Sequence, residues 1–358
     1  MLDLLLLPDS DGAVRFAAWT MVCVAVLVVV LFLYTIGLRT ATVIGAERQR
    51  RLNEEWRAVL ATVLLSEQEA RTIKLPVLPR HQRINLLELW NRTRDTVQGS
   101  AADNLRIMGD RIGIISIAER LLRRRQLQSQ ILAVQTLGHM AHEESWDHIA
   151  ALTGSQHMAL SITAAGALVD IDPQRAVQML VPLIAKRRDW PRTRVSRMLR
   201  SIGSGLVSEP LYRAVRSADD TDRVYLLQFA QLAEHDIVDA LAAELIRESK
   251  NPDVLAAALK LVSGRDDIPR LLSLTQHDAS FVRMQAARLL GRIGQPEHVP
   301  VLESLLHDSH WWVRYRAAQA IASLPFLGPN ALRALRERQQ DLYARDILEQ
   351  AYSEVGMA

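Results

Sequence analysis

Aromatic residues and cysteine are both scarce in this sequence. Aromatics make up 5% of the 358 residues, and Cys23 is the sole cysteine. The β-branched, turn-rich texture of an all-β protein is missing as well, which argues against that fold class. A single cysteine has no partner within the chain, so an intramolecular disulfide is excluded. Cysteine usage therefore gives no support for an oxidising compartment.

Short motifs of common catalytic sites are also missing. No serine lies in a Gly-x-Ser-x-Gly elbow, and Cys23 lies in an apolar run unsuited to nucleophilic catalysis. The segments GRIG and GSG lack the lysine or the strand context of a phosphate-binding loop. The sequence therefore predicts no catalytic residues and no cofactor, and we expect the protein not to be an enzyme.

One cluster of histidines needs a separate test, because histidine and carboxylate side chains together can bind a metal. His139, His142, Glu143, Asp147 and His148 lie close together in the sequence, in a turn between two expected helices. His148 is the sixth residue after His142, so the HExxH spacing of zinc proteases is absent. We interpret these as turn histidines and predict no metal site, with a metal-dependent enzyme as the alternative.

What the sequence does contain points to helices. Hydrophobic residues make up 49% of it, and leucine, alanine, arginine and glutamine dominate. All four residue types are compatible with helices, and most favour them. The charge is uneven along the chain: formal net charge is −2 over residues 1–38, +7 over 39–130 and −2 over 131–358. Positive charge beside an apolar segment is a membrane-surface pattern more than a nucleic-acid pattern.

That apolar segment contains no charged residue from Phe16 to Leu38. As a helix it would reach about 34 Å, enough to cross a hydrocarbon core of about 30 Å. The acidic start and the length argue against a cleaved signal peptide. Five arginines follow it between Arg39 and Arg57 and only Arg15 precedes it, which places the C-terminal side in the cytoplasm. We therefore predict a single-pass membrane protein, with its N-terminus outside and its C-terminal side in the cytoplasm.

An internal repeat organises the rest of the chain. HDASFVRMQAARLLGRIG at 277–294 is matched by HDSHWWVRYRAAQAIASL at 307–324. The position of Ala286 recurs at spacings of 31, 31, 31, 31, 29 and 31, through Ala133, Ala164, Val195, Leu226, Ala257, Ala286 and Ala317. A larger apolar residue usually follows each of these positions one turn later. A second apolar helix comes after each helix that carries such a position. Seven or eight such pairs predict an all-α solenoid.

The repeat resembles the HEAT family, in its short form named after phycobilisome lyases. The family pattern of Asp, Val-Arg, a small pair, Leu-Gly and Ile-Gly is met at Asp278, Val282, Arg283, Ala286, Ala287, Leu290, Gly291, Ile293 and Gly294. By this resemblance, Asp278, Arg283, Asp308 and Arg314 would form a ladder that ties adjacent repeats. Asp278, Ser280, Asp308 and Ser309 are also candidates for helix N-caps.

The expected organisation follows from the span and the repeat. A tail occupies residues 1–13, the transmembrane helix 14–38 and a basic juxtamembrane helical linker 39–79. A degenerate helical cap occupies 80–129, the repeats 130–325 and capping helices 326–358. Two segments, 75–91 and 311–325, also resemble bacterial single-pass proteins with a cytoplasmic HEAT array. That resemblance implies a scaffold at the cytoplasmic face of a bacterial cell inner membrane, which binds a membrane-embedded glycosyltransferase of polysaccharide synthesis.

Two groups of residues are candidates for surface contacts. Trp311, Trp312 and Tyr315 concentrate aromatic side chains at the start of one repeat, which is typical of a protein contact. The alternative is a hydrophobic staple in which one tryptophan is buried. Arginines near the span suit anionic lipid headgroups, namely Arg39, Arg48, Arg50, Arg51, Arg120, Arg123, Arg124 and Arg125. We expect no nucleic-acid partner, and keep a lyase and a lipid or nucleic-acid binder as alternative functions.

Overall fold

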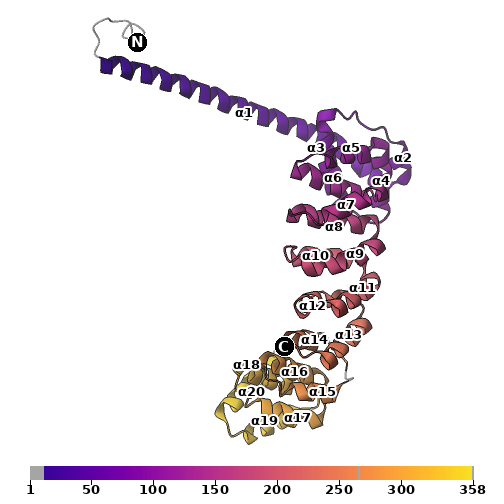
Figure 1. Ribbon diagram of the computed structural model, residues 1–358, viewed down its shortest axis with the longest axis vertical. Coiled ribbons are helices and arrows are strands. Elements are labelled where there is room, and N and C mark those ends of the chain that lie inside the picture. The colour runs from indigo at the N-terminus through magenta and orange to yellow at the C-terminus, as the bar shows by residue number, and fades with distance from the viewer. Residues whose placement is uncertain (1–11, 265–266, 357–358) are drawn as a thin grey trace. The chain divides into compact units, whose positions relative to one another are not determined.

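The computed structural model describes the backbone of residues 12–264 and 267–356, and those residues contain helices and no β-strand. The predicted all-α class is confirmed. The chain divides into two compact units, residues 1–140 and 141–358. Figure 1 labels the helices of both units.

The first unit is built on one long helix and five shorter ones. Trp56, Leu60 and Val63 near the end of the long helix are buried, as are Leu86 and Trp90 of a following helix. Because apolar residues recur three and four positions apart, one face of each helix is apolar and packs against its neighbours. The helices are α1 (Gly12–Leu65), α2 (Glu67–Thr72), α3 (Arg83–Thr96), α4 (Ser100–Ile112), α5 (Ile114–Leu122) and α6 (Leu127–His139), with the 3-10 turn η2 (Arg80–Gln82).

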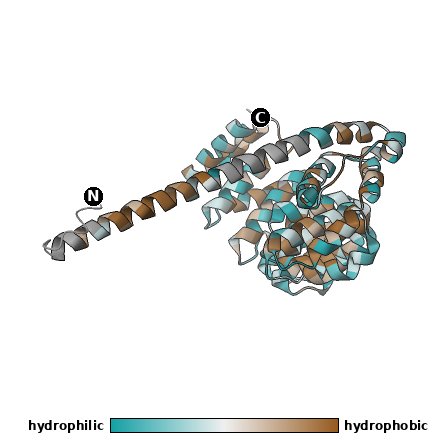
Figure 2. Ribbon diagram, turned by 90° about the horizontal axis from the view of Figure 1, so that it is seen from above, coloured by the Kyte–Doolittle hydropathy of each residue, from teal (hydrophilic) through white to brown (hydrophobic). Residues whose placement is uncertain are grey.

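Helix α1 runs without a break from the apolar segment into this unit. Its stretch Trp19–Gly37 has a mean hydropathy of 2.6 and no buried residue, and Figure 2 shows it as a continuous hydrophobic band. By length and composition the stretch fits a membrane span, and near the N-terminus it also fits a signal sequence. The backbone of the linker predicted at 39–79 is helical through Leu65.

The second unit is a succession of helix pairs. A first helix of each pair is followed by a turn and a second helix, in the order predicted from the repeat. The helices are α7 (Trp146–Leu152), α8 (Met158–Ile171), α9 (Pro173–Lys186), α10 (Arg192–Ile202), α11 (Ser204–Ser217), α12 (Asp220–Leu227), α13 (His235–Glu248), α14 (Pro252–Leu259), α15 (Ile268–Leu274), α16 (Ser280–Ile293), α17 (Val299–Leu305), α18 (Trp311–Ala322), α19 (Pro329–Arg338) and α20 (Leu342–Gly356), with 3-10 turns η3 (Glu143–Ser145), η4 (Ala230–Leu232) and η5 (Pro296–His298).

The predicted anchor positions fall on first helices, and six of the seven are buried. The exception is Ala257, which is only partly buried, whereas its neighbours Leu255 and Ala258 are buried. Helix α14 ends at Leu259, so the larger apolar residue expected one turn after Ala257 lies beyond the helix. The irregular spacing of 29 residues after Ala257 coincides with the short helix α14. The prediction that Ala257 is the buried anchor of this repeat was wrong.

The predicted N-caps were also wrong. Helix α16 is preceded by Ala279 and helix α18 by His310, and neither residue has a side-chain capping bond. The Asp308 carboxylate accepts a hydrogen bond from the amide of His310, just before α18 begins at Trp311. Asp308 therefore orders the turn that leads into α18. Its carboxylate also pairs with Arg283 of the preceding repeat.

Close packing of α16 on α18 explains one glycine of the repeat pattern. A Cβ atom at Gly291 would lie 2.6 Å from Ala320 Cα and 2.7 Å from Ala320 Cβ. Side-chain carbons do not approach that closely, so the two helix backbones need a residue without Cβ at this point. The glycine of the Leu-Gly step thus allows the first helices of adjacent repeats to pack closely.

Candidate protein-interaction surface

Three aromatic side chains of α18 form a compact group on the surface, here called the aromatic cluster: Trp311, Trp312 and Tyr315. The rings of Trp311 and Tyr315 stack with centroids 5.2 Å apart and planes 7° apart. Trp312 stands edge-on to Trp311, with centroids 4.7 Å apart. These arrangements are the ones that aromatic pairs favour. Since residues four apart share a helix face, α18 itself brings Trp311 and Tyr315 together.

Both tryptophans of the cluster are exposed, Trp311 by 52% and Trp312 by 61%. The staple alternative requires one of the two rings to be buried, and the structure buries neither. Another aromatic, Phe281, occupies the position of Trp312 in the preceding repeat, at the start of α16, and is 39% exposed. Apolar surface gathered at one place is a common mark of an interaction site.

Tyr315 is fixed by polar contacts with the last helix. Its hydroxyl donates to Glu354 Oε2 at 2.7 Å, and Gln319 Nε2 donates to the same hydroxyl oxygen at 2.8 Å. The bond to the Glu354 carboxylate raises the pKa of the Tyr315 hydroxyl and lowers the pKa of Glu354. The bonds hold the stacked face of the cluster in one orientation. Sequence reasoning missed Glu354 and Gln319, because no motif links α18 with α20.

Three arginines at equivalent positions of successive repeats bind the turn that precedes their own helix. Arg283 Nη1 donates to the carbonyls of His277 and Asp278, each at 2.8 Å. Arg314 Nε donates to the carbonyl of Asp308, and Arg345 Nε donates to that of Gln339 at 2.5 Å. Turn carbonyls that would otherwise need water are thus satisfied within each repeat. The recurrence of Arg345 was not recognised from the sequence.

Only one of these arginines also bonds to a carboxylate of the next turn, among the described residues. Arg283 Nε and Nη2 donate to Asp308 Oδ2 and Oδ1 at 2.7 and 2.8 Å, and the two side chains are only 12% and 7% exposed. The bond to Asp308 raises the pKa of the Arg283 guanidinium. Burial alone would raise the pKa of Asp308, but its bonds to Arg283 and the His310 amide bring it below the ordinary value.

The expected ladder therefore has one rung in the structure. The carboxylate of Asp278 is exposed and makes no hydrogen bond or ion pair within the part of the chain that the structure describes. The reason lies in the preceding first helix: α14 contains no arginine that could reach it. Arg314 contacts its own turn, as described above, and not a carboxylate beyond it.

The arginines expected to meet lipid headgroups are only partly described. Arg39, Arg120 and Arg123 to Arg125 are exposed, and the last four lie at the end of α5 and just after it. The side chains of Arg48, Arg50 and Arg51 lie outside the described residues. Cations at the end of a helix are favoured by its dipole, so exposure here fits a structural role as well as a lipid contact.

His139 and His142, of the histidine cluster at 139–148, contact other side chains of the protein. His139 is buried, with Nδ1 3.2 Å from Asn91 Oδ1 and Nε2 3.1 Å from Asp95 Oδ1. His142 Nδ1 lies 2.8 Å from Ser145 Oγ. No group of three histidine, cysteine or acidic side chains that could hold a metal occurs within residues 12–264 and 267–356.

Comparison with known proteins finds one family match, which covers part of the chain. The family model for HEAT repeats matches residues 224–322 and 268–353. The match includes α16, α18 and the aromatic cluster. No curated protein sequence matches the chain.

Solved structures show distant likenesses. An engineered protein is 17% identical over 83% of this chain and 98% of its own, with a TM-score of 0.33. Kap121p is 11% identical over 98% of this chain and 48% of its own, with a TM-score of 0.45, so this chain spans about half its length. A structure of microtubule polymerases with TOG domain arrays, titled for tubulin recruitment, is 11% identical over 82% and 92%, with a TM-score of 0.29. At such values these likenesses add nothing to the family match.

Proposed function

We propose that the protein is a membrane-anchored scaffold whose aromatic cluster binds a partner protein, and the match of the HEAT-repeat family model over residues 224–353 supports the scaffold. Stacked helix pairs bury a continuous core and leave a long surface on which a second protein can lie. The observation that carries the proposal is the double exposure of Trp311 and Trp312 on a helix whose other face is buried.

The membrane anchor is the stretch Trp19–Gly37 of α1. Its length and the absence of buried residues in it support a span, and the excess of arginine after it supports a cytoplasmic repeat unit. Trp56 lies about 28 Å beyond Gly37 along the unbroken helix. In this proposal the same helix that crosses the bilayer ends in the core of the first unit, so the anchor and that unit are joined without a flexible linker.

The partner is itself a membrane protein in this proposal. An anchored scaffold meets other anchored proteins at a raised effective concentration, which favours such a partner. The narrower identification, a glycosyltransferase that makes an envelope or secreted polysaccharide, rests on the resemblance of 75–91 and 311–325 to bacterial single-pass proteins. A bacterial inner membrane follows from the same resemblance.

The test is recovery of the partner by a variant of the cluster. We expect Trp312→Ala to weaken binding about tenfold, because truncating an exposed tryptophan that becomes buried at an interface costs about 1.4 kcal/mol or more. The thermal midpoint should change little, since the ring is 61% exposed. The measurement is mild-detergent pull-down of the full-length protein, quantified by mass spectrometry.

Tyr343→Ala provides the matched control for that experiment. Tyr343 is a 74% exposed aromatic of α20, and it lies about 17 Å from Glu354 along that helix. Its loss should leave recovery unchanged. If Trp312→Ala and Tyr343→Ala recover every membrane protein as well as the wild type does, the cluster is not the binding surface.

A further inference from the structure

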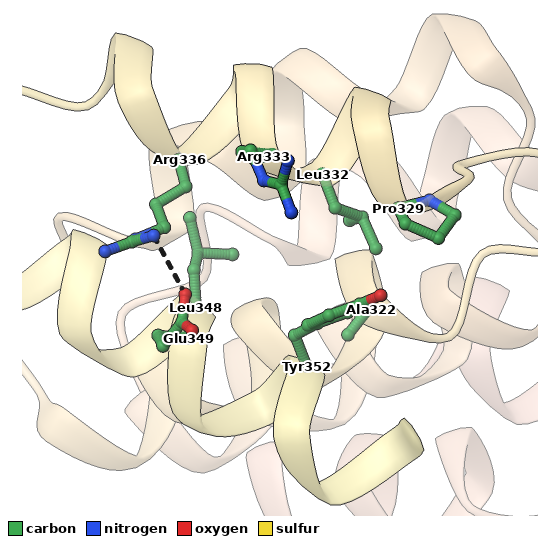
Figure 3. Close-up of a pocket in the computed structure, with 8 residues that line it drawn as sticks. All are labelled: Ala322, Pro329, Leu332, Arg333, Arg336, Leu348, Glu349 and Tyr352. Carbon is green, nitrogen blue, oxygen red and sulfur yellow. Dashed lines mark ion pairs between the residues drawn. The ribbon is translucent and has the colours of Figure 1, made fainter.

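A pocket opens between the last three helices, away from the aromatic cluster. It has a volume of about 160 Å³ and is lined by Ala322, Pro329, Leu332, Arg333, Arg336, Leu348, Glu349 and Tyr352. Ala322 ends α18, whereas Trp311 begins it, so the two sites are separated by about 17 Å of helix. Figure 3 shows side chains of α19 and α20 facing one another across the space.

The pocket exists because α19 packs incompletely. Among the residues of this helix only Leu335 is buried, and Leu332 is left partly exposed at the pocket wall. Ala322 and Leu348 are buried beneath it. Protein interiors are normally packed without such gaps. A cavity of about 150 Å³ takes up a molecule the size of benzene, so by volume this open pocket, with apolar and charged residues in its lining, has room for one large apolar side chain.

The charges at the pocket leave one cation unpaired. Arg336 Nη1 lies 3.0 Å from Glu349 Oε2, so these two charges offset each other. Arg333 is exposed and makes no hydrogen bond or ion pair within the described residues, and Figure 3 shows its guanidinium reaching from α19 toward α20. Helix α19 as a whole holds three arginines and one glutamate. A ligand for this place should therefore combine an apolar group with negative charge.

We propose that the pocket binds an acidic segment of a protein partner, with a leucine, methionine or phenylalanine side chain inside and a neighbouring carboxylate on Arg333. We prefer a protein segment to a small molecule because the proposed function takes the partner to be a protein, and Arg333 offers its carboxylate a contact; the one basic residue of α19 beyond the pocket, Arg338, already pairs with Glu303. The inference goes beyond the aromatic cluster and rests on the proposed function only in taking the partner to be a protein. It defines a second contact, at the opposite end of α18.

The experiment titrates the full-length protein in mild detergent into fluorescently labelled hexapeptide amides and follows anisotropy. One peptide has adjacent phenylalanine and glutamate in an alanine background, and two others replace the glutamate by glutamine or the phenylalanine by alanine. The parent peptide should bind about three- to tenfold more tightly than either, as expected for one partly exposed ion pair and one apolar anchor. Equal binding of the three peptides would overturn the proposal.

Variants of the protein assign the binding to this pocket. Arg333→Gln should weaken the parent peptide about fivefold and leave the glutamine peptide unchanged, because only the charge contact is lost. Glu349→Gln should strengthen the parent peptide by a few-fold, since it releases Arg336. Arg292→Gln, at an exposed arginine of α16 outside the pocket, is the control and should change nothing. Wild-type affinity in Arg333→Gln would overturn the assignment.

Two further outcomes are informative. A fourth peptide ends in phenylalanine with a free carboxylate, and binding of this peptide alone would make the site a receptor for a chain terminus, against the proposal. Trp312→Ala should leave all peptide affinities unchanged. If no peptide binds but Trp312→Ala still weakens recovery of the partner, this inference fails and the proposed scaffold function stands. If the peptides bind as predicted but Trp312→Ala recovers the partner as the wild type does, the proposed scaffold function fails and this inference stands.

Discussion

Asp308→Asn is expected to lower the free energy of unfolding by about 3 kcal/mol, because it breaks a buried ion pair and leaves Arg283 without its carboxylate. The pair joins α16 to the turn before α18, so the loss falls on the junction of two repeats. Coupling between neighbouring repeats should spread the effect beyond this turn. Urea unfolding of the detergent-solubilised protein, followed by circular dichroism, measures it.

The difference in unfolding free energy between the wild type and Asp308→Asn depends on pH, in the direction set by the shift in the pKa of Asp308. The pKa of Asp308 is below its ordinary value of 3.8, so the ionised carboxylate stabilises the fold. Its contribution is fully present above the unfolded pKa and is lost as pH falls through the folded pKa. The gap between wild type and Asp308→Asn should thus be constant above about pH 5 and shrink in more acidic solution.

Asp278→Asn supplies the matched control, because it makes the same chemical change at the equivalent turn one repeat earlier. Asp278 is exposed, and its carboxylate makes no hydrogen bond or close ion pair in the described part of the chain, so its charge acts on Arg283 less than that of Asp308 does. We expect a change of less than about 0.5 kcal/mol. Equal losses at positions 278 and 308 would contradict the assignment of the single rung.

Gly291→Ala is expected to destabilise the protein by about 1–3 kcal/mol, as overpacking does. The new methyl group would lie 2.6 Å from Ala320 Cα, and backbone atoms cannot move aside as a flexible side chain can. Helices α16 and α18 would have to separate. Thermal unfolding and hydrogen exchange of the two helices are the measurements.

The same substitution at Gly166 should have the opposite sign. Gly166 lies inside α8, and a Cβ there would meet nothing within 4 Å. Alanine is a better helix former than glycine, so Gly166→Ala should stabilise by about 0.5–1 kcal/mol. If both variants were stabilised, α16 and α18 would not approach each other as closely as the structure has them.

The helical repeat was predictable because its signal is local and recurrent. Small and large apolar residues one turn apart identify a packed helix face wherever the helix is long enough, as at Ala286 and Ala317. The prediction failed at Ala257, where the short helix α14 ends at Leu259 and shifts which positions are buried. Spacing alone cannot show where a helix stops, because the end depends on turn residues and on packing.

The surface was less predictable, because exposure depends on residues far away in the sequence. The aromatic group at 311–315 could be recognised from composition, but not that both tryptophans are exposed or that Glu354 orients Tyr315. The pocket beneath Arg333 follows from incomplete packing of α19, which no motif encodes. The ladder was predicted from resemblance, and only the pair Arg283–Asp308 has both charges in place among the described residues.

Site-specific photocrosslinking in intact cells tests the central claim most directly. A photoreactive phenylalanine analogue replaces Trp312 in the full-length protein, and the same analogue replaces Tyr343 as the control. The account predicts that position 312 crosslinks to one membrane protein that position 343 does not capture, identified by mass spectrometry of the crosslinked band. No protein captured at 312 beyond those captured at 343 would contradict the assignment of the aromatic cluster as the partner-binding surface.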